Sequence, residues 1–336
     1  LYFVMVVCIS AVLAALCWLA ANDVLSLNKE EVSAKITVSD NFTIDEVADE
    51  LKQAGIIEYP FLFRLFSKFS HADEKIDPGV YEISSNLDYR AIVTNLQKGA
   101  GAMVTVSVTI PEGKTMMQTF EILEENRVCT VEELVECATN YDFDYKFLDS
   151  STLGSEKRLE GFLFPDTYEF YEYSSPEGAI KRFLDNFDRK VSDDMYAKAE
   201  VMGYSFNDVL TIASMIEMEA ASDDERPTVA SVIYNRLHSS NFSHLQIDAT
   251  VQYALGERRE KLSYEDLQVD SPYNTYLYEG LPPGPISNPG LASIKAAIDP
   301  ENTDYYYYAL NKSGVHEFFT YYSSFEEFVN GSDFGG

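Results

Sequence analysis

The chain has 336 residues, 46% of them hydrophobic, which is enough for a membrane segment and two folded parts at about 150 residues per domain. It carries 25 basic and 55 acidic residues, a net charge of −30 at pH 7. Because phosphate backbones are held by clusters of Lys and Arg, this balance argues against nucleic acid as a partner. The sequence has neither CxxC spacing nor an HExxH motif, so we expect no metal and no cofactor.

The first stretch, 1–21, is a predicted transmembrane helix. Ser10 is its one residue that is not apolar, and no charge occurs before Asp23. As a helix it spans about 31 Å at 1.5 Å per residue, which matches the hydrocarbon core of a bilayer. A cleaved signal peptide is the alternative, but its apolar region is about 7 to 15 residues long. We therefore expect an uncleaved anchor in the cell membrane, with the acidic remainder outside the cytoplasm.

A polar stretch, 22–34, is typical of a linker, and residues 35–100 then predict a small α/β module. The module has two strands flanking two helices: a strand over 35–38, a helix opened by the capping box of Thr43 and Glu46, a helix from Pro60, and a strand over 80–83. The remaining residues, 101–336, show mixed helix and strand signals. The expected fold class is therefore α+β, with a transmembrane helix, a small module and a larger α+β domain.

An acidic and aromatic region contains the motif EGFLFPDTY from Glu160 to Tyr168. Its Gly and Pro residues disfavour a helix, so we expect a strand or an ordered loop that presents Glu160, Asp166 and Tyr168. Pro176 then opens an amphipathic helix through Val191.

The centre of the larger domain is a predicted buried helix capped by Asn207, with apolar residues almost all round. It carries Glu217 and Glu219, which lie about 200° apart around the helix axis and therefore cannot act side by side. A carboxyl group in apolar surroundings has a raised pKa, which suits a general acid at neutral pH. The alternative is that both glutamates are salt-bridged structural residues.

Further polar residues follow the central helix. A helix from Pro227 carries Asn235 and Arg236 near its end, and a long aromatic loop, 271–290, is expected to end in Asn288 as the N-cap of a helix over 291–298. A hairpin is predicted from strands over 305–310 and 315–322. Candidate site residues in these parts are Gln246, Asp248, Tyr273, Asn274 and His316. For Asp248 helix capping is the alternative, and a lone strand histidine such as His316 is more often structural.

Several motifs occur together in one order: EGFLFPDTY, IASMIEMEA, ERPTVASVIYNRL, LQIDATVQYALG, SPYNTY, GLPPGPISNPG and GVHEFF. In this order and spacing the chain resembles the YceG-like family of endolytic murein transglycosylases over nearly all of its length. The resemblance implies one membrane anchor, a LysM-like module over 35–100 and a catalytic domain over 101–336. It also implies peptidoglycan glycan strands as substrate and penicillin-binding proteins, the peptidoglycan synthases, as partners.

The resemblance implies that Glu217 is the catalytic glutamate and that Glu219 is a second acidic position of the same motif. The family commonly has Lys where this chain has Met218, and Thr-Asp-Pro-Thr where this chain has Ile247-Asp-Ala-Thr250. Residues expected to surround the sugar or to support the site are Glu160, Asp166, Tyr168, Asn235, Gln246, Asp248, Tyr273, Asn274 and His316, with Arg226 and Arg236 supporting acidic side chains.

The implied reaction breaks the bond between N-acetylmuramic acid and N-acetylglucosamine and forms a 1,6-anhydro end, for which one carboxyl group suffices. Two alternatives stay open. A hydrolase would use Glu217 with Glu160 or Asp166, because hydrolysis generally needs two carboxylates about 5 to 10 Å apart. A non-catalytic scaffold would bind the wall through the LysM-like module and its aromatic surface.

Overall fold

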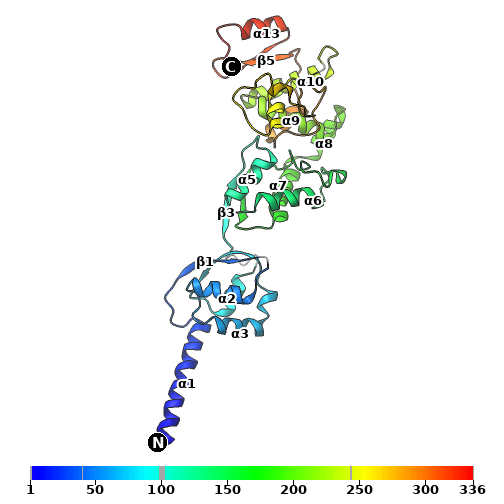
Figure 1. Ribbon diagram of the computed structural model, residues 1–336. Helices are drawn as coiled ribbons and strands as arrows, with labels where there is room; N and C mark the ends of the chain where they lie inside the picture. The colour runs from blue at the N-terminus through cyan, green and yellow to red at the C-terminus, as the bar shows by residue number, and fades with distance from the viewer. Residues whose placement is uncertain (1, 40, 98–102, 243, 336) are drawn as a thin grey trace. The chain divides into compact units, whose positions relative to one another are not determined.

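The computed structural model describes residues 2–39, 41–97, 103–242 and 244–335. The chain forms two compact units. The first comprises residues 1–107, 126–128 and 169–174, and the second comprises the rest (Figure 1). The predicted boundary between residues 100 and 101 lies outside the described residues. The mixed α+β fold class is confirmed.

The first unit opens with α1 (Tyr2–Leu25), the one helix of the described chain that is long and apolar enough to cross a membrane. Its 18-residue apolar window has no residue buried inside the protein. The helix is longer than predicted, because residues 22–25 continue it. The expectation of a polar linker from residue 22 is therefore wrong for these four residues, and Asp23 among them is buried.

A β-α-α-β arrangement follows: β1 (Ser33–Val38), α2 (Ile44–Gln53), α3 (Pro60–Ser70) and β2 (Gly79–Ser84). The two strands are antiparallel, with Ile36 opposite Tyr81, and both residues lie in the core of the unit. Thr43 and Glu46 form the predicted capping box at the start of α2. The predicted order of strands and helices is confirmed, and its LysM-like character stays a prediction. The unit also contains η1 (Ala72–Glu74) and α4 (Tyr89–Asn95).

Two paired strands, β3 (Thr105–Thr109) and β4 (Thr167–Tyr171), have residues in both units. The second unit then holds a group of helices: α5 (Met116–Glu125), α6 (Val131–Asn140), η2 (Ser150–Thr152), α7 (Pro176–Lys190) and α8 (Asp193–Val201). The segment before β4 forms a turn at Gly161, whose φ is +88°. A Cβ there would lie 2.6 Å from Pro285 Cγ, so the turn requires glycine to pack closely against the aromatic loop.

The rest of the second unit packs around α9 (Phe206–Glu219), which contacts α8, α10, α11 and α12. Residues 209–216 are all buried, as predicted for a helix that is apolar all round. The other elements are η3 (Asp223–Glu225), α10 (Arg226–His238), α11 (Asp248–Leu255), η4 (Asp266–Gln268), α12 (Leu291–Ile298), β5 (Tyr307–Leu310), β6 (His316–Phe319) and α13 (Tyr322–Val329). Strands β5 and β6 form the predicted hairpin.

Two predicted helix caps are wrong. Ser205 caps α9 through a capping box with Asp208, because its hydroxyl reaches the third helical N–H, so Asn207 lies inside the helix. Gly290 occupies the N-cap position of α12. Asn288 instead accepts a hydrogen bond from Leu163 and donates one to the Lys114 carbonyl, and it therefore joins three segments of the unit.

Candidate functional site

Glu217 lies in the last turn of α9 and faces the start of α12. Its Oε2 accepts hydrogen bonds from the Gly290 N–H at 3.0 Å and the Ser293 hydroxyl at 2.8 Å, and its Oε1 lies 3.2 Å from Arg226 Nη1. The side chain is 6% exposed. An ion pair and two hydrogen bonds therefore hold Glu217 as a buried carboxylate, which is the arrangement of a structural ion pair.

Arg226 connects several groups around Glu217. Its Nε donates to Asp223 at 2.9 Å and its Nη1 donates to the Ser293 hydroxyl. Glu112 lies further off, 3.9 Å from Nη2. Arg226 therefore bridges α10, α12 and the end of α9. By contrast, Arg236 donates to the carbonyls of Tyr306 and Leu245 and forms no ion pair with an acidic group among the described residues.

Glu219 points to a different part of the unit. Its Oε2 accepts a hydrogen bond from the Tyr308 hydroxyl at 2.9 Å. Burial among protein groups raises the pKa of Glu219, and the charge of Asp248 acts in the same direction, whereas the hydrogen bond from Tyr308 opposes the shift. The residue keeps some accessible surface. Glu219 is therefore a carboxyl group whose proton is retained to a higher pH than that of an ordinary glutamate.

The residues around Glu219 include two of the predicted site residues, Asp248 and His316. Tyr276 donates to Asp248 at 2.6 Å, and the ring of His316 packs edge-on against Tyr308 with centroids 5.1 Å apart. His316 is held in turn by Glu225, which lies 2.8 Å from its Nδ1 and accepts its backbone N–H at 2.9 Å. Although burial alone would raise the pKa of Glu225, the bonds from His316 lower it. Glu219 thus lies in a cluster of aromatic and acidic side chains.

The loop before α11 brings Gln246 to the surface beside this cluster. Gln246 is exposed and has a left-handed backbone conformation with φ +55°. Its backbone N–H donates to the Thr275 carbonyl, and this hydrogen bond helps to hold that conformation. Asp248 is the first residue of α11, and the N-cap position belongs to Ile247. The alternative that Asp248 caps the helix is therefore wrong, because its carboxylate accepts from Tyr276.

Asn235 and Asn274 position backbone segments. The Asn235 amide donates to the carbonyls of Thr303 and Tyr305 at 2.8 and 2.9 Å. The Asn274 amide is buried and donates to the carbonyls of Leu267 and Val269 at 3.0 and 2.9 Å. The donors of both amides are committed to the protein, so the expectation that these residues surround a sugar is not supported by their contacts.

Asp166 and Tyr168 lie beside α7. Asp166 accepts from the Thr167 N–H and from the Asn186 amide, and the hydrogen bond from Thr167 is the main reason that its pKa is lowered. Tyr168 is buried, donates to the Phe164 carbonyl and accepts from Asn186 at 2.8 Å. These contacts connect β4 to α7, whereas the partners of Glu217 belong to α10 and α12.

Glu160 is buried at the start of α5, where it accepts from the Met116 N–H at 2.8 Å and from the Tyr253 hydroxyl at 3.1 Å. Tyr273 packs on Tyr253 with ring centroids 4.8 Å apart, and the Lys157 ammonium lies over both rings. Burial raises the pKa of Glu160 to about 7. The cluster therefore holds a carboxyl group that titrates near neutral pH inside a folded structure.

We expect Glu160→Gln to change how stability depends on pH. Because burial raises the pKa from 4.5 to about 7, the folded state binds this proton more tightly than the unfolded state. Protonated Glu160 therefore stabilises the folded state below pH 4.5, and this contribution is lost as pH rises to about 7. The loss lowers the free energy of unfolding by roughly 3 kcal/mol. Glutamine does not titrate, so the variant does not lose stability in this way. Its melting temperature relative to that of the parent should therefore be higher at pH 8 than at pH 4. An equal pH dependence in both proteins would contradict the assignment.

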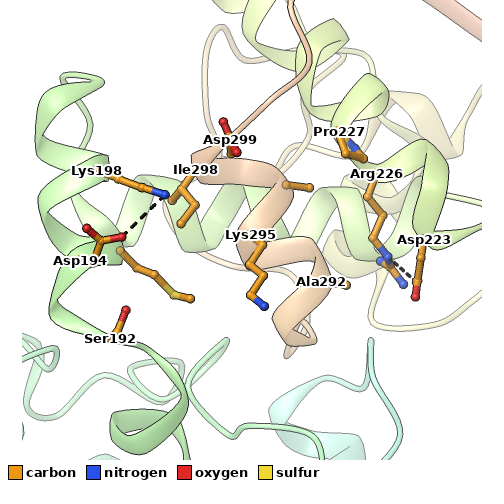
Figure 2. A pocket seen from close by; sticks show the side chains of 12 residues that line it. Ser192, Asp194, Lys198, Asp223, Arg226, Pro227, Ala292, Lys295, Ile298 and Asp299 are labelled. Atoms are coloured by element: carbon orange, nitrogen blue, oxygen red, sulfur yellow. Dashed lines mark hydrogen bonds and ion pairs between the residues drawn. The ribbon is translucent and has the colours of Figure 1, made fainter.

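A cavity of about 490 Å³ lies between α8, α10 and α12, and Arg226 is one of the residues that line it. Figure 2 shows the pair of Arg226 and Asp223 on one side of the cavity and the pair of Lys198 and Asp194 on the opposite side. Its lining includes neither Glu217 nor Glu219. The cavity is therefore adjacent to the ion pairs of Arg226 and separate from both glutamates of α9.

Residues 36–331 match the YceG-like family. The chain belongs to the YceG-like family. An endolytic murein transglycosylase of Bacillus subtilis (strain 168) is 32% identical over 302 residues, which cover 86% of this chain and 82% of that protein. An endolytic murein transglycosylase of Streptococcus pneumoniae serotype 2 (strain D39 / NCTC 7466) is 27% identical over 316 residues, which cover 87% of this chain and 56% of that protein.

A crystal structure also matches this YceG-like chain. A protein from Listeria monocytogenes described as YceG-like has 30% sequence identity and a TM-score of 0.58, and the match covers 88% of this chain and 98% of that chain. The resemblance drawn from the sequence motifs is thereby confirmed. The chain spans little more than half the length of the pneumococcal relative.

In this YceG-like chain, sequence reasoning missed Glu112. Its side chain is 50% exposed, and burial together with the charge of Glu217 raises its pKa. The carboxyl group lies against Gly290, where a Cβ would be 1.8 Å from Glu112 Oε1. The available signal was the turn after β3, in which Gly113 has φ +77° and donates its N–H to Asn288. That signal indicates a close backbone approach and does not by itself identify the carboxyl group.

Proposed function

We propose that this YceG-like protein is a lytic transglycosylase that cleaves peptidoglycan strands between N-acetylmuramic acid and N-acetylglucosamine. The relatives named endolytic murein transglycosylase support the reaction class. The single observation that carries the chemistry is Glu219, a carboxyl group with a raised pKa beside an exposed loop. A general acid must be protonated at the working pH, and burial of the carboxyl group provides this state.

The reaction needs one such group. The protonated carboxyl gives its proton to the glycosidic oxygen as the bond from that oxygen to C1 of the muramic residue breaks. The resulting carboxylate then takes the proton of the muramic 6-hydroxyl as that oxygen bonds to C1. The ring closes, the carboxyl group is restored, and water does not enter the product.

Of the two glutamates on α9, the geometry favours Glu219 as the proton donor. The carboxylate of Glu217 is engaged by Arg226, Ser293 and the Gly290 N–H, so both of its oxygens already have protein partners. Glu219 has the Tyr308 hydroxyl as its side-chain donor and lies near the charge of Asp248. The assignment of catalysis to Glu217 stays a prediction from the sequence, and the structure gives Glu217 the contacts of a positioning residue.

The proposal places the enzyme in the cell membrane through α1, with the second unit outside the cytoplasm, where nascent glycan strands and their synthases, the penicillin-binding proteins, are found. The length and composition of α1 support the anchor. A reporter that is active only outside the cytoplasm, fused after Gly336, tests the orientation. Activity of a cytoplasmic reporter at the same position would contradict it.

Mass spectrometry of glycan strands digested by the purified full-length protein tests the reaction. We expect products with 1,6-anhydro-muramic ends, each one water lighter than the corresponding reducing end. Reducing ends would indicate the hydrolase alternative with two carboxylates. Glycan strands that stay uncleaved although the protein binds them would indicate the non-catalytic scaffold.

A further inference from the structure

Helix α3 of the first unit has an exposed apolar face. Phe61, Leu65 and Phe69 are 60%, 52% and 78% exposed, and their spacing of four residues places them on one side of the helix. On the other side, Phe63 and Ser67 are buried in the core of the unit. A helix with one face in the core normally turns charged or polar residues outward. The outer face of α3 is instead formed by two phenylalanines and a leucine.

The end of the apolar helix α1 is fixed to the residues just before α3. Asp23 is 2% exposed, and its carboxylate accepts from the backbone N–H groups of Glu58 and Tyr59 at 2.9 and 2.8 Å. The Tyr89 hydroxyl donates to it at 2.6 Å and the Lys29 ammonium lies 2.7 Å away. Four partners therefore hold this one carboxylate, and they join the end of α1 to the folded module.

This contact places α3 at the end of the apolar span. Asp23 follows the last residue of the apolar stretch 1–21 by two positions, or about 3 Å along a helix. Tyr59, which donates to Asp23, directly precedes Pro60, the first residue of α3. Figure 1 shows α3 beside the end of α1 and running across its direction. If α1 spans a bilayer, the start of α3 lies at the level where the hydrocarbon core ends.

The composition of α3 matches this position. Its charged residues are Arg64, which is ion-paired with Asp45 and Asp49 of α2, and Lys68, which is exposed next to Phe69. The ring of Tyr59 lies 6.2 Å from that of Phe61. Aromatic and basic side chains are enriched at membrane interfaces, where apolar groups enter the acyl boundary and charges stay with the headgroups.

We propose that the face formed by Phe61, Leu65 and Phe69 lies in the interfacial layer of the bilayer that α1 spans. The inference rests on the proposed membrane insertion of α1. The first unit is then held to the lipid at two places, and the Asp23 contact fixes the angle between them. The module does not swing on a flexible linker from residue 22, and the exposed apolar face of α3 provides the attraction to the lipid.

Tryptophan fluorescence in liposomes tests the proposal, because the chain has a single Trp, Trp18 in α1. The probe is Leu65→Trp in a Trp18→Phe background of the full chain, and the matched control is Glu82→Trp, at an exposed position of β2 in the same unit. We expect lipids brominated near the headgroup to quench the Trp at position 65 and to leave the Trp at position 82 unchanged. The emission at position 65 should also be shifted to the blue of that at position 82.

The native Trp18 distinguishes failure of the membrane insertion of α1 from failure of the interfacial position of α3. If brominated lipids do not quench Trp18 in the parent protein, membrane insertion of α1 fails. If they quench Trp18 but not the Trp at position 65, insertion holds and the interfacial position of α3 is overturned. Protection of position 65 from iodide without quenching by brominated lipid would show that protein, such as a second copy of the chain, covers the face, and this also overturns the proposal.

Discussion

Glu219→Gln is expected to reduce the rate of glycan cleavage by about 10²- to 10⁴-fold, the usual contribution of a positioned general acid. The amide keeps the shape of the side chain and can still accept from the Tyr308 hydroxyl, but it has no proton to transfer to the glycosidic oxygen. The measurement is the rate at which 1,6-anhydro ends appear, together with the melting temperature of the variant. We expect the melting temperature to stay close to that of the parent or to rise.

Glu217→Gln is the matched control, because it makes the same chemical change two residues away on the same helix. It removes one partner of a buried ion pair, so we expect a lower melting temperature and a smaller loss of activity per folded molecule. The opposite pattern would be abolished cleavage by Glu217→Gln at an unchanged melting temperature, with activity retained by Glu219→Gln. That result would support the assignment made from the sequence and reject Glu219 as the donor.

The sequence predicted features that depend on neighbours along the chain. The capping box of Thr43 with Glu46 occurs as expected, because it joins residues three positions apart. The opposite directions of Glu217 and Glu219 also followed from helix geometry, since two residues along a helix turn about 200°. Their structural partners confirm that the two carboxyl groups face different elements.

The sequence could not show what lies on each side of α9. The small residues before Glu217 contact a loop, because Ser214 accepts from the Ile286 N–H at 3.0 Å and its carbonyl accepts from the Ser287 hydroxyl. A loop and a ligand both need small side chains, so composition does not separate them. The helix also ends at Glu219, with Ala220 as its C-cap.

The surroundings of Glu219 depend on residues far away in the sequence. Tyr308 lies 89 positions further along the chain and His316 lies 91 positions after Glu225. Periodicity identified the hairpin that carries both residues, but it gave no information on which helix the hairpin would meet. The balance between an ion-paired Glu217 and a Glu219 with a raised pKa is therefore a property of tertiary packing.

The second large effect is expected for Arg226→Met, which should lower the stability of α9 and its neighbours by about 3 to 5 kcal/mol. The substitution keeps much of the side-chain volume but leaves the Glu217 carboxylate buried at 6% exposure without its positive partner. Asp223 contributes little to the loss, because its side chain is 78% exposed. Hydrogen exchange of the α9 amides gives the free energy of local opening directly.

A double variant shows whether the loss comes from the unpaired charge. In Arg226→Met with Glu217→Gln, the buried carboxylate is absent, and the glutamine can still accept from the Ser293 hydroxyl and the Gly290 N–H. The double variant should therefore be more stable than Arg226→Met alone, although it carries one more substitution, because the two residues form one ion pair and their effects do not add. Additive losses would mean that Arg226 stabilises the unit by packing and by its contact with Ser293, independently of Glu217.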